Sequence, residues 1–274
     1  MLCTATCPDA VPDCILAKGD EEEDRGEETE EDLTGQGGGG GGGGGADPSG
    51  MGIAGLPSDI LVEVTARIAG ESTTPLDDIV SLRRSCKVFR DATAAREVGR
   101  CMAVDREWRL HWWDKERFLS VLGECAATGN PEASYILGLE EICNRRGKES
   151  GLRHLHHAMK HGHAVAAYTI GMIMLRDAYN LEGIEEAMGY LEGCSAARTN
   201  SKIKIASVRR EAASVVRRLT MRRWRTAEPA APCADPRCGE METTEAWDED
   251  DEQRRFCSRL CRWKHEYRKF VQRI

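Results

Sequence analysis

The sequence predicts a mainly α-helical chain, in which a helical motif near residue 60 precedes a short α-solenoid and a small cysteine-based module. Three observations predict this fold. Apolar residues recur at helical spacing after helix-starting residues at Pro57 and at Pro75. A later stretch repeats itself at an offset of 33 residues. Four cysteines are grouped near the end of the sequence: Cys233, Cys238, Cys257 and Cys261.

Residues 1–50 are expected to be disordered. The segment from Asp20 to Asp32 contains ten acidic residues and one arginine, and nine consecutive glycines run from Gly37 to Gly45. Such a composition buries too little apolar surface to offset the entropy of ordering the chain. The segment also accounts for the net charge of −8, so the acidic balance says little about what the folded part binds.

No apolar run is long enough to cross a membrane, and the N-terminal residues lack the pattern of a secretory signal. We therefore expect no membrane contact and a location in the nucleus, the cytoplasm or both. In those compartments the twelve cysteines are expected to be reduced or metal-bound.

Two short amphipathic helices are predicted between Leu56 and about residue 95. In the first, Ile60, Leu61, Val64 and Ile68 share one face. The second begins near Pro75 and places Ile79, Leu82, Cys86 and Phe89 at helical spacing.

The opening LPSDIL and the later pattern of Leu82, Cys86, Lys87 and Phe89 resemble the F-box, a short helical motif that docks onto the Skp1 adaptor of cullin-based ubiquitin ligases. The alternative is a generic helical hairpin. The resemblance implies that some apolar residues face Skp1 instead of their own core. The Skp1-binding residues that it implies are Leu56, Pro57, Ile60, Leu61, Leu82 and Cys86.

Aromatic residues are concentrated just after this motif, at Trp108, Trp112, Trp113 and Phe118. They either join the first helices to the next domain or form a contact surface for a partner.

The solenoid is predicted from an internal repeat. The segment from Gly129 through Tyr135 to Gly138 aligns at an offset of 33 with the segment from Gly162 through Tyr168 to Gly171. At an offset of 36, Leu191 repeats Leu155. Units of this length pair two helices and bury their apolar faces only against neighbouring units. The pattern resembles the Sel1-like repeat, a relative of the tetratricopeptide repeat (TPR).

Two charged or polar clusters have open interpretations. His154, His157 and His161 lie at helical spacing and are either surface histidines of a repeat helix or metal ligands. The stretch from Lys202 to Arg225 is a basic amphipathic helix. It is either a nuclear-import or nucleic-acid patch, or it is neutralised by the eight acids between Glu240 and Glu252.

The four grouped cysteines have the spacing of a structural zinc site. Two pairs of thiolates separated by a long loop can converge on one tetrahedral ion, so we expect one structural Zn²⁺ held by Cys233, Cys238, Cys257 and Cys261. The alternative is four free cysteines. The segment FCSRLCRWKHEYRKF resembles the second half of the MYND zinc finger, but the ligands of its second site are missing. The resemblance implies a degenerate finger in which His265 packs or hydrogen-bonds and is no ligand.

These observations divide the chain into a disordered tail (1–50), an F-box (51–100), Sel1/TPR-like helical repeats with flanking helices (101–225) and a MYND-like finger (226–274). The order of the modules resembles a family of plant F-box proteins. It implies a non-catalytic subunit of an SCF-type ubiquitin ligase that docks Skp1, and through it a cullin complex, and recruits a protein substrate.

The alternative is a nuclear zinc-finger regulator that binds nucleic acid or a protein partner and has no ubiquitin-ligase role. We expect nucleic acid to be the less favoured partner. No enzyme is expected, because no nucleophile and base pair has a recognisable motif and the predicted metal site has no open position.

Overall fold

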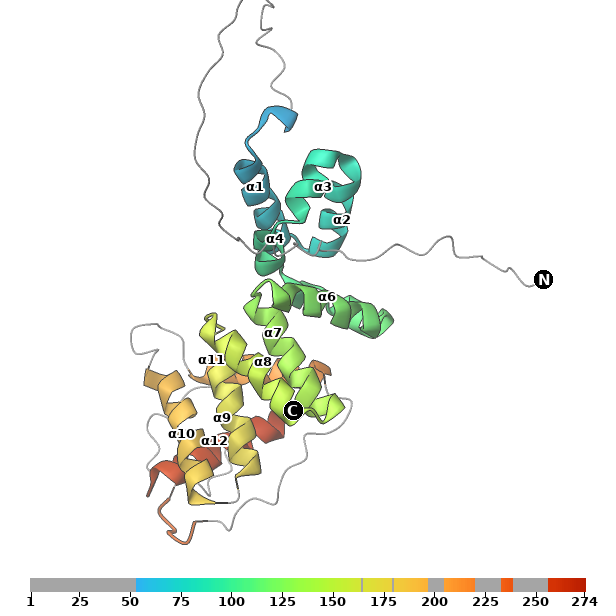
Figure 1. Ribbon diagram of the computed structural model, residues 1–274. Helices are drawn as coiled ribbons and strands as arrows, with labels where there is room; N and C mark the ends of the chain where they lie inside the picture. Colours follow the sequence, from blue (N-terminus) through green and yellow to red (C-terminus); the bar gives the residue numbers. More distant parts are fainter. Residues whose placement is uncertain (1–52, 164, 179, 197–204, 220–232, 239–255) are drawn as a thin grey trace, which may run out of the picture.

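Residues 53–163, 165–178, 180–196, 205–219, 233–238 and 256–274 are described by a computed structural model (Figure 1). This part of the chain is helical and contains no strand. None of its helices is both long and apolar enough to cross a lipid bilayer. The predicted tail, the glycine run and the acids between Glu240 and Glu252 lie outside the described residues.

The N-terminal helical motif consists of four helices: α1 (Ser58–Glu71), α2 (Pro75–Ser85), α3 (Lys87–Thr93) and α4 (Arg96–Cys101), with a short 3₁₀ turn, η1 (Ile53–Gly55), before them. Pro75 stands in the first turn of α2, where its missing N–H costs no hydrogen bond. The core of the motif contains Leu61, Ala69 and Ile79, all of them buried. A Cβ at Gly70 would lie 3.2 Å from the carbonyl oxygen of Cys101, so α1 and α4 approach closely there.

Two buried polar side chains join this motif to the rest of the chain. Asn130 donates hydrogen bonds to the carbonyl oxygens of Gly99, at 3.0 Å, and Met102, at 2.8 Å. Glu107, at the end of the 3₁₀ turn η2 (Val104–Arg106), accepts a hydrogen bond from the backbone N–H of Leu76 at 3.0 Å. These side chains fix the motif on the first repeat because they pair backbone groups that would otherwise be buried without partners.

The aromatic segment after the motif is divided in its roles. Trp108 and Phe118 pack together, with ring centroids 5.6 Å apart. Trp112 and Trp113, at the end of α5 (Trp108–Trp113), are exposed, and Trp113 is 87% accessible. The predicted joining role therefore holds for two rings, while the other two form a surface.

The helical repeats follow in antiparallel pairs, α6 (Lys115–Ala127) with α7 (Pro131–Glu140), then α8 (Lys148–Lys160) with α9 (Ala166–Asp177), and α10 (Leu181–Ala196) opens a third unit. A five-residue π-helical turn, Glu141–Arg145, follows α7. The aligned glycines Gly129 and Gly162 both end a helix with positive φ, at 92° and 86°. A side chain would strain the backbone at both turns.

Equivalent residues also build equivalent contacts between successive units. A Cβ at Gly138 would lie 2.8 Å from Leu155 Cγ, and one at Gly171 would lie 2.6 Å from Leu191 Cγ. The 33- and 36-residue offsets align these two pairs with each other. The helices thus approach through a glycine and a leucine at both junctions, which the sequence alignment alone did not single out.

The last two helices depart from the regular order. The helix α11 (Ile205–Leu219) packs across α7 and α9, and α12 (Arg259–Arg273) packs against α10 and α11 (Figure 1). A regular array would place the next helix of the sequence, α11, as the partner of α10. Instead α12, from the predicted finger, contacts α10.

Candidate metal centre and docking surface

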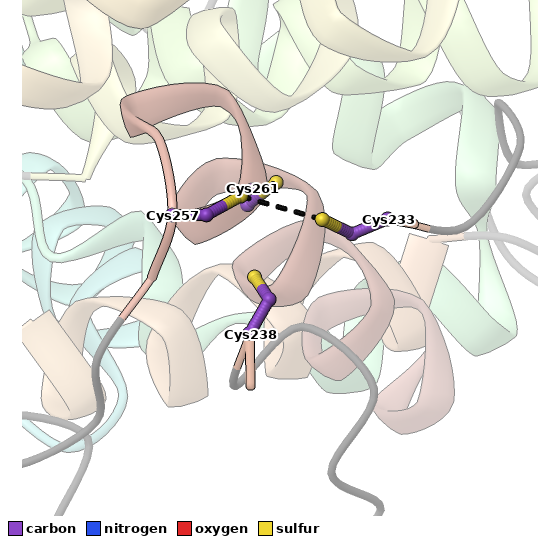
Figure 2. A group of neighbouring side chains, drawn as sticks. All are labelled: Cys233, Cys238, Cys257 and Cys261. Atoms are coloured by element: carbon purple, nitrogen blue, oxygen red, sulfur yellow. Dashed lines mark hydrogen bonds between the residues drawn. The ribbon is translucent and has the colours of Figure 1, made fainter. Parts of the chain in front are cut away.

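The four grouped cysteines converge on one point, as Figure 2 shows. Cys233 and Cys238 lie on a loop in which Asp235 accepts hydrogen bonds from the backbone N–H groups of Arg237 and Cys238. Cys257 immediately precedes α12. Cys261 lies in the first turn of α12, and its backbone N–H is capped by the hydroxyl of Ser258 at 3.1 Å.

The spacing of the sulfur atoms fits a zinc ion. All four Sγ atoms lie within 4.8 Å of one another, and the Sγ atom of Cys257 lies 3.3 Å from those of both Cys233 and Cys261. Four thiolates on a tetrahedral zinc, each about 2.3 Å from the ion, lie about 3.8 Å apart. Small adjustments would therefore bring all four to the ideal distance. The 3.3 Å separations are far too long for disulfide bonds, which measure about 2.05 Å.

The packing of the thiols is itself a reason to expect a cation. Because the Cys257 thiol is held against the sulfur of Cys233, its pKa is raised. A metal ion at the centre would neutralise the thiolates and reverse this effect. The donor set is all sulfur, which suits zinc among the common biological metals. Four coordination positions would be filled, so the site is structural in character.

His265 lies near the cluster but does not belong to it. In the part of the chain that the structure describes, the group that converges consists of the four cysteines. The imidazole of His265 is buried, and its ring centroid lies 5.4 Å from that of Phe256. This position agrees with the predicted packing role.

A buried ion pair ties the metal-bearing helix to the repeats. Glu266 of α12 accepts two hydrogen bonds from the guanidinium group of Arg209 on α11 and a third from the hydroxyl of Tyr168 on α9, the last at 2.9 Å. The side chains of Arg209 and Glu266 are 1% and 7% exposed. The equivalent tyrosine of the preceding unit, Tyr135, bonds the hydroxyl of Thr169 on the following repeat at 2.9 Å. The helix α12 therefore stands where a further repeat would supply the partner of Tyr168.

Other contacts hold α12 along its length. Trp263 and Phe270 are buried in the common core, and the Phe270 ring meets the edge of Tyr168 with centroids 5.9 Å apart. At the N-terminal end, Arg259 makes a bidentate ion pair with Glu192 of α10, with two 2.6 Å bonds. The helix α12 of the predicted finger is thus continuous with the helical repeats in its packing.

A second candidate site is the outer surface of α1. The apolar side chains of Leu56, Ile60 and Val64 are exposed, Ile60 to 50%, whereas Leu61 is 4% exposed and packs inside. Ile60 and Val64 are four residues apart and share one face of α1, and Leu56 lies two residues before the helix begins. We call these three exposed side chains the apolar stripe. Ile53 adds a further exposed side chain before the helix begins. Exposed apolar stripes of this kind mark interaction sites more often than isolated apolar residues do.

The remaining predicted docking residues occupy different environments. Pro57 and Cys86 are exposed, and Leu82 packs partly against the core. Among the other cysteines, Cys125 is buried, which raises the pKa of its thiol to about 12, whereas Cys86 and Cys101 are exposed. The side chain of Cys194 lies outside the described residues.

The histidines of α8 are engaged with the protein. His157 Nδ1 lies 3.1 Å from the hydroxyl oxygen of Ser134, and His161 Nδ1 lies 2.9 Å from the carbonyl oxygen of His157. No group of three ligands forms here among the described residues, where the cysteine cluster is the one such group. The surface-histidine interpretation is the one that this geometry favours.

The apolar side of the basic helix is confirmed, and its charges are partly explained. Val208, Ala212 and Val216 are buried on α11, while Arg217 and Arg218 are exposed. The partner of the buried Arg209 is Glu266, a residue that sequence reasoning did not connect with it. The proposed neutralisation by residues 240–252 falls outside the described part of the chain.

Comparison with known proteins supports the repeat interpretation. Residues 105–217 match the family model described as plant tetratrico peptide repeats. The matched span runs from η2 to α11 and contains all the paired helices. No match is found among curated proteins, and none among solved structures. The chain thus contains TPR-like helical repeats, while the F-box and MYND resemblances lie outside the matched residues and stay predictions.

Proposed function

We propose that this chain is a non-catalytic, substrate-recruiting F-box subunit of an SCF-type ubiquitin ligase. The N-terminal helical motif would dock a Skp1-like adaptor, and the TPR-like repeats would hold a target protein. The mechanism is proximity, because a tethered target presents its lysines at high effective concentration to the conjugating enzyme. Repeats of this type are used for protein–protein contact.

The observation that supports this proposal is the stripe formed by Leu56, Ile60 and Val64. These side chains are exposed although the motif already has its own core, closed by Leu61 and Ile79. Side chains that do not stabilise the fold are available to stabilise a complex. Their burial against a partner would contribute about 1.5–3 kcal/mol each.

The zinc site belongs to this proposal as a structural element. One Zn²⁺ held by Cys233, Cys238, Cys257 and Cys261 would link the loop at residues 233–238 to the start of α12. The ion would supply folding free energy and no chemistry. We also propose that this region is a degenerate MYND finger, because the segment around α12 resembles the second half of that finger.

The test is binding of purified Skp1 to the full chain and to a variant with Leu56→Ala, Pro57→Ala and Ile60→Ala. Loss of two large apolar contacts should weaken binding at least about 100-fold, or about 3 kcal/mol. The matched control is Trp112→Ala with Trp113→Ala, which also removes exposed apolar surface but outside the motif. Absence of Skp1 binding by the folded, unmutated chain would refute the proposal.

A nucleic-acid-binding regulator is the second candidate, favoured by the exposed Arg217 and Arg218 of α11. It predicts binding of an oligonucleotide that weakens steeply with salt, because cations that contact phosphates release counterions. The Skp1 complex, held by apolar contacts, should change little between low and moderate salt. The same titration therefore separates the two candidates.

A further inference from the structure

The outward face of α8 carries a short row in which two histidines lie between two cations. At 100° per residue, Arg153, His156, His157 and Lys160 point to one side, while Leu155 and Ala158 are buried on the other. The row spans eight residues from Arg153 to Lys160, which is about 10 Å at a rise of 1.5 Å per residue. It lies on the middle helix of the repeat array (Figure 1).

The cations of this row are not used by the fold. Among the described residues, the side chains of Arg153 and Lys160 have neither an ion pair nor a hydrogen bond. Glu149 shares the face one turn before Arg153, a spacing that allows a pair, but the two are not bonded. The charges are thus available to an external group.

The histidines between these cations are held in place. The ring of His157 is tilted by 33° against that of His161, just beyond the row, with centroids 4.1 Å apart. The Ser134 hydroxyl fixes His157, and a backbone carbonyl fixes His161. The side-chain entropy that a partner would have to remove on binding is therefore small at the centre of the row.

Neighbouring acids limit what can bind. The ring of His156 lies 5.6 Å from that of Tyr190 on α10, so the two helices are adjacent. On α10 the side chains of Glu182 and Glu186 are exposed, whereas that of Glu185 pairs with Arg259 of α12. A long polyanion such as nucleic acid would meet these carboxylates, whereas an extended acidic segment of about three residues covers 10 Å and fits the row alone.

We propose that the face of α8 from Arg153 to Lys160 docks a short acidic segment of the protein that the repeats recruit. The inference rests on the proposed function, since it names the chemistry of the recruited partner, but it concerns a surface separate from α1. Charge complementarity supplies both the orientation and the preference for acidic sequences.

The experiment measures fluorescence anisotropy of a labelled peptide of alternating aspartate and glycine, titrated with the zinc-loaded full chain. Its asparagine analogue serves as the uncharged peptide. We expect Arg153→Glu with Lys160→Glu to weaken binding at least tenfold. The control Arg100→Glu with Arg117→Glu makes the same change in net charge at exposed arginines of α4 and α6 and should leave binding within about twofold, because neither residue belongs to the face of α8.

Several results would overturn the proposal. These are equal binding of the asparagine peptide, equal loss in both charge-reversal variants, and better competition by an oligonucleotide than by the free acidic peptide. Binding that appears only when the acids between Asp20 and Asp32 are replaced by neutral residues would assign the face to the chain's own tail. Skp1 binding, measured on the same preparations, is expected to be unchanged in every variant. Loss of acidic-peptide binding can therefore be distinguished from loss of Skp1 docking.

Discussion

The ion pair between Arg209 and Glu266 gives the sharpest test of how α12 is attached. Replacing Glu266 by leucine would leave the guanidinium group buried and would remove the carboxylate that accepts two of its hydrogen bonds. Removing one partner of a buried pair costs about 3–5 kcal/mol. The hydroxyl of Tyr168 would lose its acceptor as well, so the upper part of that range is expected.

The chain contains a matched control with the same chemistry and less burial. Arg259 and Glu192 form an equally bidentate pair whose side chains are 58% and 40% exposed. Solvent screens such a pair, so Glu192→Leu should cost no more than about 1 kcal/mol. The two substitutions thus differ in burial and not in the type of contact.

Urea unfolding followed by circular dichroism measures both free energies of unfolding. The double variant Arg209→Met with Glu266→Leu completes the cycle, and it should be far more stable than Glu266→Leu alone because no charge is then left buried. The reasoning is refuted if Glu266→Leu costs as little stability as Glu192→Leu. It is also refuted if the double variant loses as much free energy of unfolding as Arg209→Met and Glu266→Leu lose when their separate losses are added.

Three further predictions concern the metal, the repeat junctions and an orphaned imidazole. Cys257→Ser should abolish binding of one zinc per chain and lower the melting temperature, while the exposed Cys86→Ser should change neither; metal analysis and calorimetry measure both. Gly171→Ala should destabilise the protein by about 1–3 kcal/mol because its Cβ would meet Leu191. Gly189→Ala, which lies in open space on α10, should stabilise the protein by about 0.5–1 kcal/mol. Equal effects of the two substitutions in urea unfolding would contradict the close approach at Gly171. Both ring nitrogens of His111 are buried without hydrogen bonds, and burial, with the nearby Lys115, lowers the pKa of the imidazole. The unfolded chain then binds the proton more readily, so stability should fall as pH drops below about 6.5; His111→Phe should melt higher and lose that part of the acid sensitivity in a pH series of thermal scans.

Local patterns in the sequence predicted the helices and the repeat well. Pro75 and the helical spacing around it located α2, and the 33-residue offset located the equivalent turns at Gly129 and Gly162. These signals are local or periodic, because each depends on residues within one turn or one repeat. The convergence of the four cysteines was likewise readable from their spacing.

The parts that the sequence did not reveal depend on distant residues. Ile60 and Leu61 look alike in the apolar pattern, but one is exposed and the other buried, because the neighbouring helices decide which side of α1 is covered. Arg209 and Glu266 are 57 residues apart, so nothing local connects them. The position of α12 against α10 is a tertiary choice of the same kind.

The placement of α12 also has a consequence for the order in which the chain can fold during synthesis. Helices α9 and α11 leave the ribosome before α12, and until residues 259–273 emerge, Tyr168 and Arg209 have no partner in Glu266. The apolar surface that Trp263 and Phe270 later cover is open during the same interval. A nascent chain with this surface exposed is prone to aggregate until α12 has been synthesised and has packed. Chaperone demand should therefore depend on how quickly the segment from residue 220 to residue 273 is translated.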